Sequence, residues 1–163
     1  MNFNIFSSQV RQRIQRWVIC LVAIATITLL TPTTSAAADA AITVYRDPSC
    51  SCCGGWIDHL ASQGFQASNV PTSDMDNLKQ QYGVPDEMTS CHTAIIDGYV
   101  IEGHVPVDDI KRLLAEQPDV VGIAVPGMPV GTPGMESGDS RDSFTVFSFD
   151  QQGHTDVFNQ YSF

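Results

Sequence analysis

The chain has 163 residues, the length of one ordinary domain, and its formal net charge at pH 7 is −10. A surface this acidic repels the phosphates of nucleic acids and of anionic lipids, and nucleic acid is excluded as a partner. The charge is compatible with cation binding, but it fits a well-solvated exported protein equally well.

Residues 1–38 have the pattern of a secretory signal peptide. Three arginines precede an apolar run over 18–30, and small residues follow in TSAAADA. The rival interpretation is a retained membrane anchor, but a span needs about 20 apolar residues and this run is shorter. We therefore expect cleavage after Ala38 or Ala40, export to the periplasm or another compartment outside the cytoplasm, and a mature domain over 39–163. No stable membrane insertion is expected after cleavage.

Beyond this leader, strand and helix patterns alternate along the chain. In order, they predict a strand over 41–47, a helix over 54–64, a strand over 65–71, a helix over 73–83, two strands over 92–103 and a helix over 106–117. The two strands over 92–103 flank Asp97-Gly98, a pair favoured in tight hairpin turns. This β-α-β-α-β-β-α order is that of a thioredoxin-like α/β fold.

The composition changes after Pro118. Residues 121–140 are rich in glycine and proline and predict an ordered loop. The segments 143–150 and 154–161, joined by Gln-Gln-Gly, predict a terminal β-hairpin. We therefore expect a single thioredoxin-like domain that carries an added loop and a C-terminal hairpin.

Three cysteines lie at the predicted junction of the first strand and the first helix. Cys50, Cys52 and Cys53 occupy four positions there, and Cys91 follows about forty residues later. A disulfide between neighbouring residues is strained, so Cys50–Cys53 is the one comfortable pair within the cluster. A pairing of one of these thiols with Cys91 remains open. A helix N-terminus favours a thiolate, which is both the nucleophile and the metal ligand.

The third thiol of the cluster, Cys52, is not needed by a dithiol oxidoreductase and would invite disulfide exchange there. Crowded thiolates suit a soft ion, Cu(I) above all, with Zn(II) as the borderline competitor. Cys91 can complete a four-thiolate set, and His92 beside it can add a nitrogen donor. Crowded thiolates can also bridge more than one Cu(I).

Weaker candidates for the same site are His104, Met128 and Met135, since imidazole and thioether groups also bind copper. Their ordinary alternatives are a strand-end histidine and methionines that fill the core. His59, about two turns along the first helix, and His154, in the terminal hairpin, are expected to be a surface and a structural residue.

Several motifs of this chain resemble the CopG-like family of small exported bacterial proteins. They are PSCSCCGGW, SCHTAIIDGYVIEGHVP, IKRLLAEQPDVVGIAVPGMPVGTPGME and the closing VFNQY. The resemblance implies a thioredoxin-like domain that takes part in copper resistance and binds copper through clustered cysteines. Carried over by position, the C-x-C-C motif of the family falls on Cys50, Cys52 and Cys53, and its Cys-His on Cys91 and His92. The G-H-V-P and G-M-P motifs fall on 103–106 and 127–129.

The sequence therefore predicts an exported copper-binding protein that sequesters, transfers or changes the oxidation state of copper. Its partners would be copper ions and other exported copper-handling proteins. The alternative is an enzyme, a thiol–disulfide oxidoreductase. In it, Cys50 would attack the substrate disulfide and Cys53 would resolve the resulting mixed disulfide. A weaker alternative is a structural zinc domain.

Overall fold

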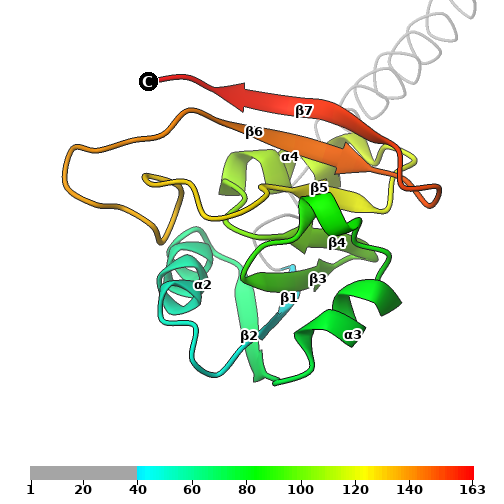
Figure 1. Cartoon of the computed structure of the whole chain (residues 1–163), viewed down its shortest axis with the longest axis horizontal. Coiled ribbons are helices and arrows are strands. Elements are labelled where there is room, and N and C mark those ends of the chain that lie inside the picture. The colour runs from blue at the N-terminus through cyan, green and yellow to red at the C-terminus, as the bar shows by residue number, and fades with distance from the viewer. Residues whose placement is uncertain (1–39) are drawn as a thin grey trace, which may run out of the picture. The chain divides into compact units, whose positions relative to one another are not determined.

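The computed structural model describes residues 40–163, which form one seven-stranded mixed sheet with three α-helices (Figure 1). The strands are β1 (Ala41–Arg46), β2 (Gln66–Pro71), β3 (His92–Ile96), β4 (Tyr99–Glu102), β5 (Gly122–Ala124), β6 (Phe144–Phe149) and β7 (Thr155–Tyr161). The helices are α2 (Cys52–Ser62), α3 (Met75–Gln81), α4 (Val107–Glu116) and the single 3-10 turn η2 (Asp86–Met88). The predicted α/β class is confirmed. The predicted leader and its cleavage positions lie outside the described residues.

The strand order across the sheet is β2-β1-β3-β4-β5-β6-β7. β1 runs parallel to β2, while β3 is antiparallel to both β1 and β4. β4 and β5 are parallel, and β6 and β7 complete the sheet as an antiparallel hairpin. Within residues 40–163, no helix combines the length and the apolar character needed to cross a bilayer.

The two faces of the sheet carry separate hydrophobic clusters because successive side chains of a strand point to opposite faces. One cluster joins the central strands to Trp56 and Leu60 of α2 and to Ile110 and Leu113 of α4. The other cluster joins Val84 and Met88, from the segment that follows α3, to Val100 and Phe149 of the sheet. We call these the α2/α4 face and the α3 face. Neighbouring residues of one strand therefore contribute to different faces.

The turn between β3 and β4 has the predicted geometry. Asp97 and Gly98 both adopt positive φ angles, 48° and 85°. Two consecutive residues in this region define the primed turn that matches the twist of a two-residue hairpin. The turn sets the register in which Thr93 lies opposite Glu102.

One part of the sequence-based prediction was wrong: the segment over 121–140 is not entirely a loop. Its first residues form β5, which joins β4 to the terminal hairpin. A Cβ on Gly122 would lie 2.0 Å from the carbonyl oxygen of Val100, so only glycine permits this close pairing. A strand of three residues is too short to show an alternating pattern, which is why the sequence does not reveal it.

The terminal hairpin is fixed to α4 by a buried carboxylate. Asp109 is 2% exposed and accepts hydrogen bonds from the hydroxyl of Tyr161 at 2.7 Å and from the side-chain amide of Asn159 at 2.8 Å. The hairpin predicted from the sequence is therefore confirmed as an integral part of the sheet.

Candidate metal and thiol site

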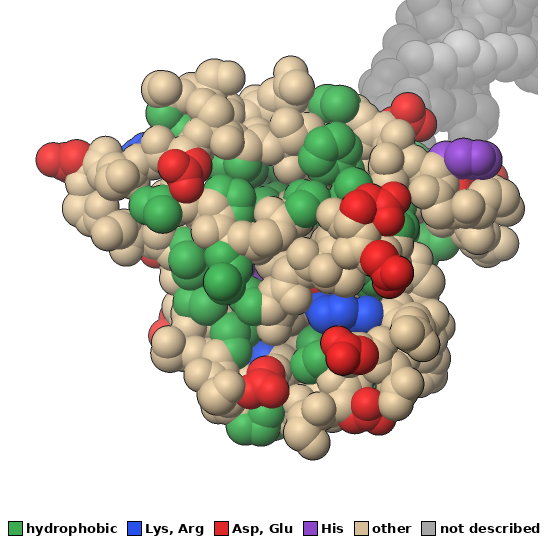
Figure 2. Space-filling view, in the orientation of Figure 1, with side chains coloured by type: hydrophobic (Ala, Val, Ile, Leu, Met, Phe, Trp, Pro, Cys, Tyr) green, Lys and Arg blue, Asp and Glu red, His purple; other side chains and the backbone are tan. Residues whose placement is uncertain are grey.

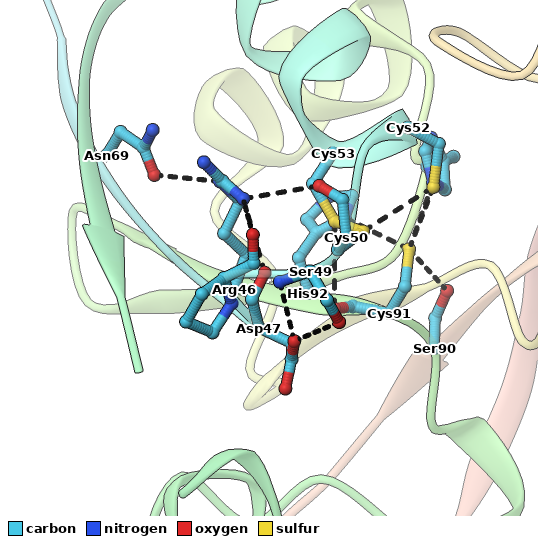
Figure 3. Close-up of a disulfide and its surroundings, with 12 residues drawn as sticks. Arg46, Asp47, Ser49, Cys50, Cys52, Cys53, Asn69, Ser90, Cys91 and His92 are labelled. Atoms are coloured by element: carbon cyan, nitrogen blue, oxygen red, sulfur yellow. Dashed lines mark hydrogen bonds between the residues drawn. A yellow bond between two sulfur atoms is a disulfide. The ribbon is translucent and has the colours of Figure 1, made fainter. Parts of the chain in front are cut away.

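The turn that carries the cysteines is braced by its own backbone and by β1. The amide of Cys50 donates to the carbonyl of Asp47 at 3.0 Å, and the Asp47 carboxylate accepts from the amide of Ser49 at 2.8 Å. The guanidinium of Arg46, at the end of β1, donates to the carbonyl of Cys50 at 3.2 Å and to Asn69 of β2 at 3.0 Å. Figure 3 shows Arg46 between these groups. These bonds fix where the first thiol lies.

The turn leads into the N-terminus of α2, an end that favours negative charge. Cys52 and Cys53 are its first two residues, and its first turn contains no acidic residue. Ser51, at the N-cap position, makes no side-chain capping bond. Cys52 and Cys53 therefore lie at the positive end of the helix dipole, an end that favours a thiolate over a thiol.

The four cysteines form one group, as predicted (Figure 3). Cys50 and Cys53 are joined by a disulfide, whereas Cys52 and Cys91 are free. The Sγ of Cys52 lies 3.5 Å from the Sγ of Cys50 and 4.0 Å from that of Cys91. Of the pairings left open by the sequence, the structure contains the comfortable local pair.

A second group of donors shares Cys91 with the first. It consists of Cys91, His92 and His104. The Sγ of Cys91 lies 3.1 Å from Nε2 of His104 and 3.5 Å from Nδ1 of His92. Cys91 precedes β3, and His104 follows β4, so the hairpin brings the two residues together. His104, a weaker candidate in the sequence, makes the closer approach of the two histidines.

The tautomer of His104 follows from its second hydrogen bond. Its Nδ1 lies 2.8 Å from the carbonyl oxygen of Pro133, which can only accept, so Nδ1 carries the proton. Nε2 then holds a lone pair that faces the Cys91 sulfur. Histidines that bind metals usually donate their other N–H to a carbonyl or carboxylate in this way. His104 is thus oriented as a nitrogen ligand.

His92 is held in the core of the α2/α4 face. It is fully buried between two aromatic neighbours, with ring-centroid distances of 4.4 Å to Trp56 and 4.9 Å to His104. Trp56 is itself fixed by a 2.9 Å hydrogen bond to the carbonyl of Val105. The Nε2 of His92 has no hydrogen-bond partner within residues 40–163. The nitrogen of His92 that faces the Cys91 sulfur is the other one, Nδ1.

The ionisation of these groups depends on burial. Burial, with a smaller effect of the neighbouring Cys52, raises the pKa of Cys91 to about 12. Burial lowers the pKa of His92 well below its ordinary value, and the charges of His104 and Lys79 add to this effect. Burial also lowers the pKa of His104, although its bond to Pro133 opposes the shift. At neutral pH the metal-free site therefore holds neutral imidazoles and a protonated Cys91.

These histidines should make the metal-free protein sensitive to acid. The unfolded chain binds protons on histidine below pH 6.5, whereas the folded chain with its lowered pKa does not, so stability falls as the pH falls. For His92 alone we expect a loss of about 1 kcal/mol between pH 6.5 and 5.5. Urea unfolding at several pH values measures it. The loss should shrink in His92→Gln and persist in His59→Gln, and equal losses in both variants would refute this origin.

The segment between β5 and β6 crosses the N-terminus of α2 and carries the Pro133 carbonyl; it is the yellow and orange excursion above α2 in Figure 1. Gly134 adopts φ +81°, and a Cβ there would lie 2.5 Å from the amide nitrogen of Trp56. On the other side, a Cβ on Gly55 would lie 3.1 Å from the Cα of Gly134. Two glycines in contact let this segment approach the helix closely enough to position His104.

Replacing Gly134 by alanine should therefore destabilise the protein and disturb His104. Gly138 is the matched control, since it also has a positive φ, +56°, but a Cβ there meets nothing within 4 Å. Both variants carry the left-handed penalty of about 1–2 kcal/mol, and only Gly134→Ala adds a steric cost of about 1–3 kcal/mol. Thermal unfolding compares them. Equal shifts in Tm would contradict the close packing.

The remaining candidates lie in different surroundings. Met128 is 55% exposed, and Met135 is half-buried, one residue after Gly134. Their participation stays a prediction. His59 is half-buried in α2, and His154 pairs with Asp150 at 3.0 Å in the turn of the terminal hairpin. Neither belongs to the two donor groups.

A buried charged network that was not predicted from the sequence lies behind the site. Lys79 of α3 pairs with Glu102 of β4, and the same carboxylate accepts hydrogen bonds from the amide of Ser90 at 2.6 Å and from the hydroxyl of Thr93 at 2.6 Å. Glu102 is fully buried and Lys79 is 6% exposed. The sequence does not show that Lys79 and Glu102 are buried, because lysine and glutamate side chains are ordinarily exposed.

The donor set fits a soft or borderline metal ion. It offers two free thiols, two more after reduction of the disulfide, and two neutral imidazoles. Thiolates select Cu(I), Zn(II) and iron–sulfur clusters, while imidazole also suits Cu(II). No carboxylate belongs to either group, so hard ions such as Mg²⁺ and Ca²⁺ do not fit.

The fold and the site together define an α/β protein with a thiol–imidazole site at a strand–helix junction. A family model described as "Protein of unknown function, DUF411" matches residues 88–135. Two solved structures of copper resistance protein CopG are similar to this chain. Form 2 is 48% identical over 76% of this chain and 99% of its own, with a TM-score of 0.73. Form 1 is 49% identical, covers 74% of this chain and 96% of its own, and has a TM-score of 0.71. The chain belongs to the CopG family. A search of curated proteins gave no match.

Proposed function

We propose that this protein is an exported copper-binding protein that handles copper during copper stress. The observation that carries the proposal is the position of Cys91, which belongs to both the four-cysteine group and the Cys91–His92–His104 group. Relatives at 48–49% identity are copper resistance proteins, which supports copper as the ion. A thiolate shared by two donor groups can bridge more than one ion.

We propose further that the first four strands and the three helices form a thioredoxin-like domain. The β-α-β-α-β-β-α order, the parallel pair β1–β2 and the antiparallel β3 support it. In that fold the junction of the first strand and helix carries reactive sulfur. β5, β6, β7 and the segment that crosses α2 are then additions that supply the Pro133 contact to His104.

Filling the four-cysteine group requires reduction of the Cys50–Cys53 disulfide. Two electrons and two protons from an external dithiol break the S–S bond, yield two thiols and convert the donor to its own disulfide. Cu(I) then displaces the thiol protons, so binding tightens as the pH rises. His92 and His104 supply nitrogen donors on the other side of Cys91. Met128 and Met135 are auxiliary thioether candidates.

The protein's export is a proposal that rests on the leader over 1–38. Copper would then be loaded outside the cytoplasm, and other exported copper-handling proteins would deliver or receive it. The acidic side chains spread over the surface in Figure 2 agree with a partner that is not a nucleic acid.

A second candidate function is thiol–disulfide exchange, and one observation favours it. Cys50 is half-buried, whereas its partner Cys53 is fully buried. In a dithiol oxidoreductase, the accessible thiolate at the helix N-terminus attacks the substrate disulfide, and the shielded thiol resolves the mixed disulfide. A structural zinc domain is a weaker candidate, because a closed zinc site needs four ligands and the two groups together offer six donors.

Anaerobic titration of the reduced mature protein tests these functions. Cu(I) and Zn(II) are added against competing chelators, and the bound ions are counted per chain. Tight Cu(I) binding supports the proposal, while one tightly bound Zn(II) with weak copper affinity supports a structural zinc domain. Negligible affinity for both metals, with reduction of a model disulfide, supports the oxidoreductase.

A single substitution separates the two leading functions. Cys52 is free, and its sulfur lies between those of Cys50 and Cys91. Cys52→Ser should leave the Cys50–Cys53 pair intact but remove a donor, so we expect copper affinity to fall by about tenfold or more while disulfide exchange survives. A variant that retains copper affinity and loses exchange activity would reverse the assignment.

A further inference from the structure

The charged network behind the site lies on the opposite face of the sheet from the cysteines. In β3, His92 packs on the α2/α4 face against Trp56, and the next residue, Thr93, points to the α3 face. There Thr93 lies opposite Glu102 and bonds to it, and Lys79 of α3 completes the cluster. Two ionised groups are thus buried directly behind the donors.

Glu102 connects this network to the chain that carries Cys91. One carboxylate oxygen accepts from both Lys79 and the backbone amide of Ser90, the residue that precedes Cys91. The other accepts from Thr93 at 2.6 Å. The Ser90 amide therefore has a charged acceptor, which gives a stronger hydrogen bond than a neutral one.

Two further contacts hold the same residue. The Ser90 hydroxyl donates to the carbonyl of Gly127, which lies in the segment after β5. A Cβ on Gly103, which adopts φ +75°, would lie 2.5 Å from the Ser90 hydroxyl, so only glycine leaves room for Ser90. Ser90 is fixed from three directions, and the adjacent Cys91 sulfur contacts a thiol, a hydroxyl and two imidazoles.

Burying an ion pair is expensive, and apolar residues of similar volume often stabilise a fold equally well. The pair is therefore poorly explained by stability alone. The Glu102 carboxylate of this pair accepts from Ser90 N–H and so fixes the residue before Cys91. The position of Cys91 matters because its sulfur must lie within reach of both α2 and His104.

From these contacts, and resting on the proposed copper-binding function, we propose that Glu102 and Lys79 are positioning residues of the copper site. Glu102 holds Cys91 in place through the Ser90 amide, and Lys79 holds the Glu102 carboxylate in the orientation that accepts from Ser90 N–H. The network acts from the α3 face without touching the metal.

Two double variants separate positioning from simple stabilisation. Lys79→Met with Glu102→Leu removes the charges and the acceptor for Ser90. Lys79→Met with Glu102→Gln also removes the charges but keeps a side-chain oxygen that can accept from Ser90 N–H. Tyr161→Phe is a further control, because it removes a part-buried hydrogen bond to a carboxylate, Asp109, that belongs to neither donor group.

Two measurements are made on each variant. In the reduced, metal-free protein, hydrogen exchange of the Ser90 amide is followed by NMR. In the Cu(I)-loaded protein, affinity is measured against a competing chelator. We expect the leucine variant to show faster Ser90 exchange and about tenfold weaker copper binding, as for loss of a group that orients a ligand. The glutamine variant should fall between the leucine variant and wild type in both measurements, because it keeps an acceptor for Ser90 N–H but not its charge. Tyr161→Phe should stay within about twofold of wild type.

The two readouts can fail separately. Equal Ser90 exchange in the leucine and glutamine variants would overturn the anchor, whether or not the protein binds copper. If Ser90 exchange differed between the leucine and glutamine variants but their copper affinities were equal, the positioning role would be overturned. Absence of copper binding by the wild-type protein would refute the proposed function and, with it, the role in a copper site, while the exchange rates would still report on the anchor.

Discussion

Replacing Cys91 by serine should cause the largest loss of copper binding of any single substitution in this protein. Cys91 belongs to both donor groups, so its removal leaves neither complete. Loss of a residue that merely orients a ligand costs 10–100-fold in affinity, and loss of a shared ligand should exceed about 100-fold. Serine has nearly the same size, and its hydroxyl can donate to Nε2 of His104 as the thiol does, so the fold should survive.

The comparison with Cys52→Ser makes this result specific. Cys52 belongs only to the four-cysteine group, and its loss leaves Cys91, His92 and His104 in place. Cu(I) affinity and the number of ions per chain are measured for both variants by the same competition. If Cys52→Ser lost as much copper as Cys91→Ser, the sulfur of Cys91 would not be the shared donor.

The largest expected effect on folding belongs to Lys79→Met. Removing the ammonium leaves the fully buried Glu102 without its counter-ion, and breaking a buried ion pair on one side costs about 3–5 kcal/mol. Burial already raises the pKa of Glu102, and Lys79 opposes that shift. In Lys79→Met the carboxyl should therefore take up a proton more readily, and the loss of stability should be greatest at neutral and higher pH.

Urea unfolding at pH 7 measures this effect in the metal-free protein. Adding Glu102→Gln to Lys79→Met should recover most of the lost stability, because no charge then remains unpaired and the side-chain oxygen can still accept from Ser90 N–H. Lys111→Met is the control: Lys111 makes only a 3.4 Å contact with Gln63 on the surface and should change stability little. A double variant as unstable as the single one would show that the cost comes from packing and not from an unpaired charge.

The cysteine cluster at the start of α2 could be predicted because Cys50, Cys52 and Cys53 are close together in the sequence. Loop geometry favoured Cys50–Cys53 as the local pair but left a pairing with Cys91 open, and the structure contains the local pair. The hairpin turn at Asp97-Gly98 follows from the φ angles that this pair tolerates. Cys91 was assigned to the site from the expected strand order, and the distances agree.

What could not be predicted depends on contacts between distant segments. The close approach of His104 to Cys91 requires the carbonyl of Pro133, which lies 29 residues further along the chain. In the sequence, Glu102 looks like an ordinary exposed acidic residue at the end of a strand. The structure shows that Glu102 and its partner Lys79 are both buried. β5 was missed because a strand of three residues is too short to show a pattern of alternating apolar and polar residues.

The site takes its donors from the start of α2, the residues that enter β3 and the residue that follows Gly103, three places far apart in the sequence. An ion bound there ties these places together as a removable cross-link. Because the unfolded chain cannot assemble the same donors, each bound ion stabilises the native state in proportion to the logarithm of its free concentration. The protein's resistance to unfolding and proteolysis would then rise and fall with the copper supply of its compartment.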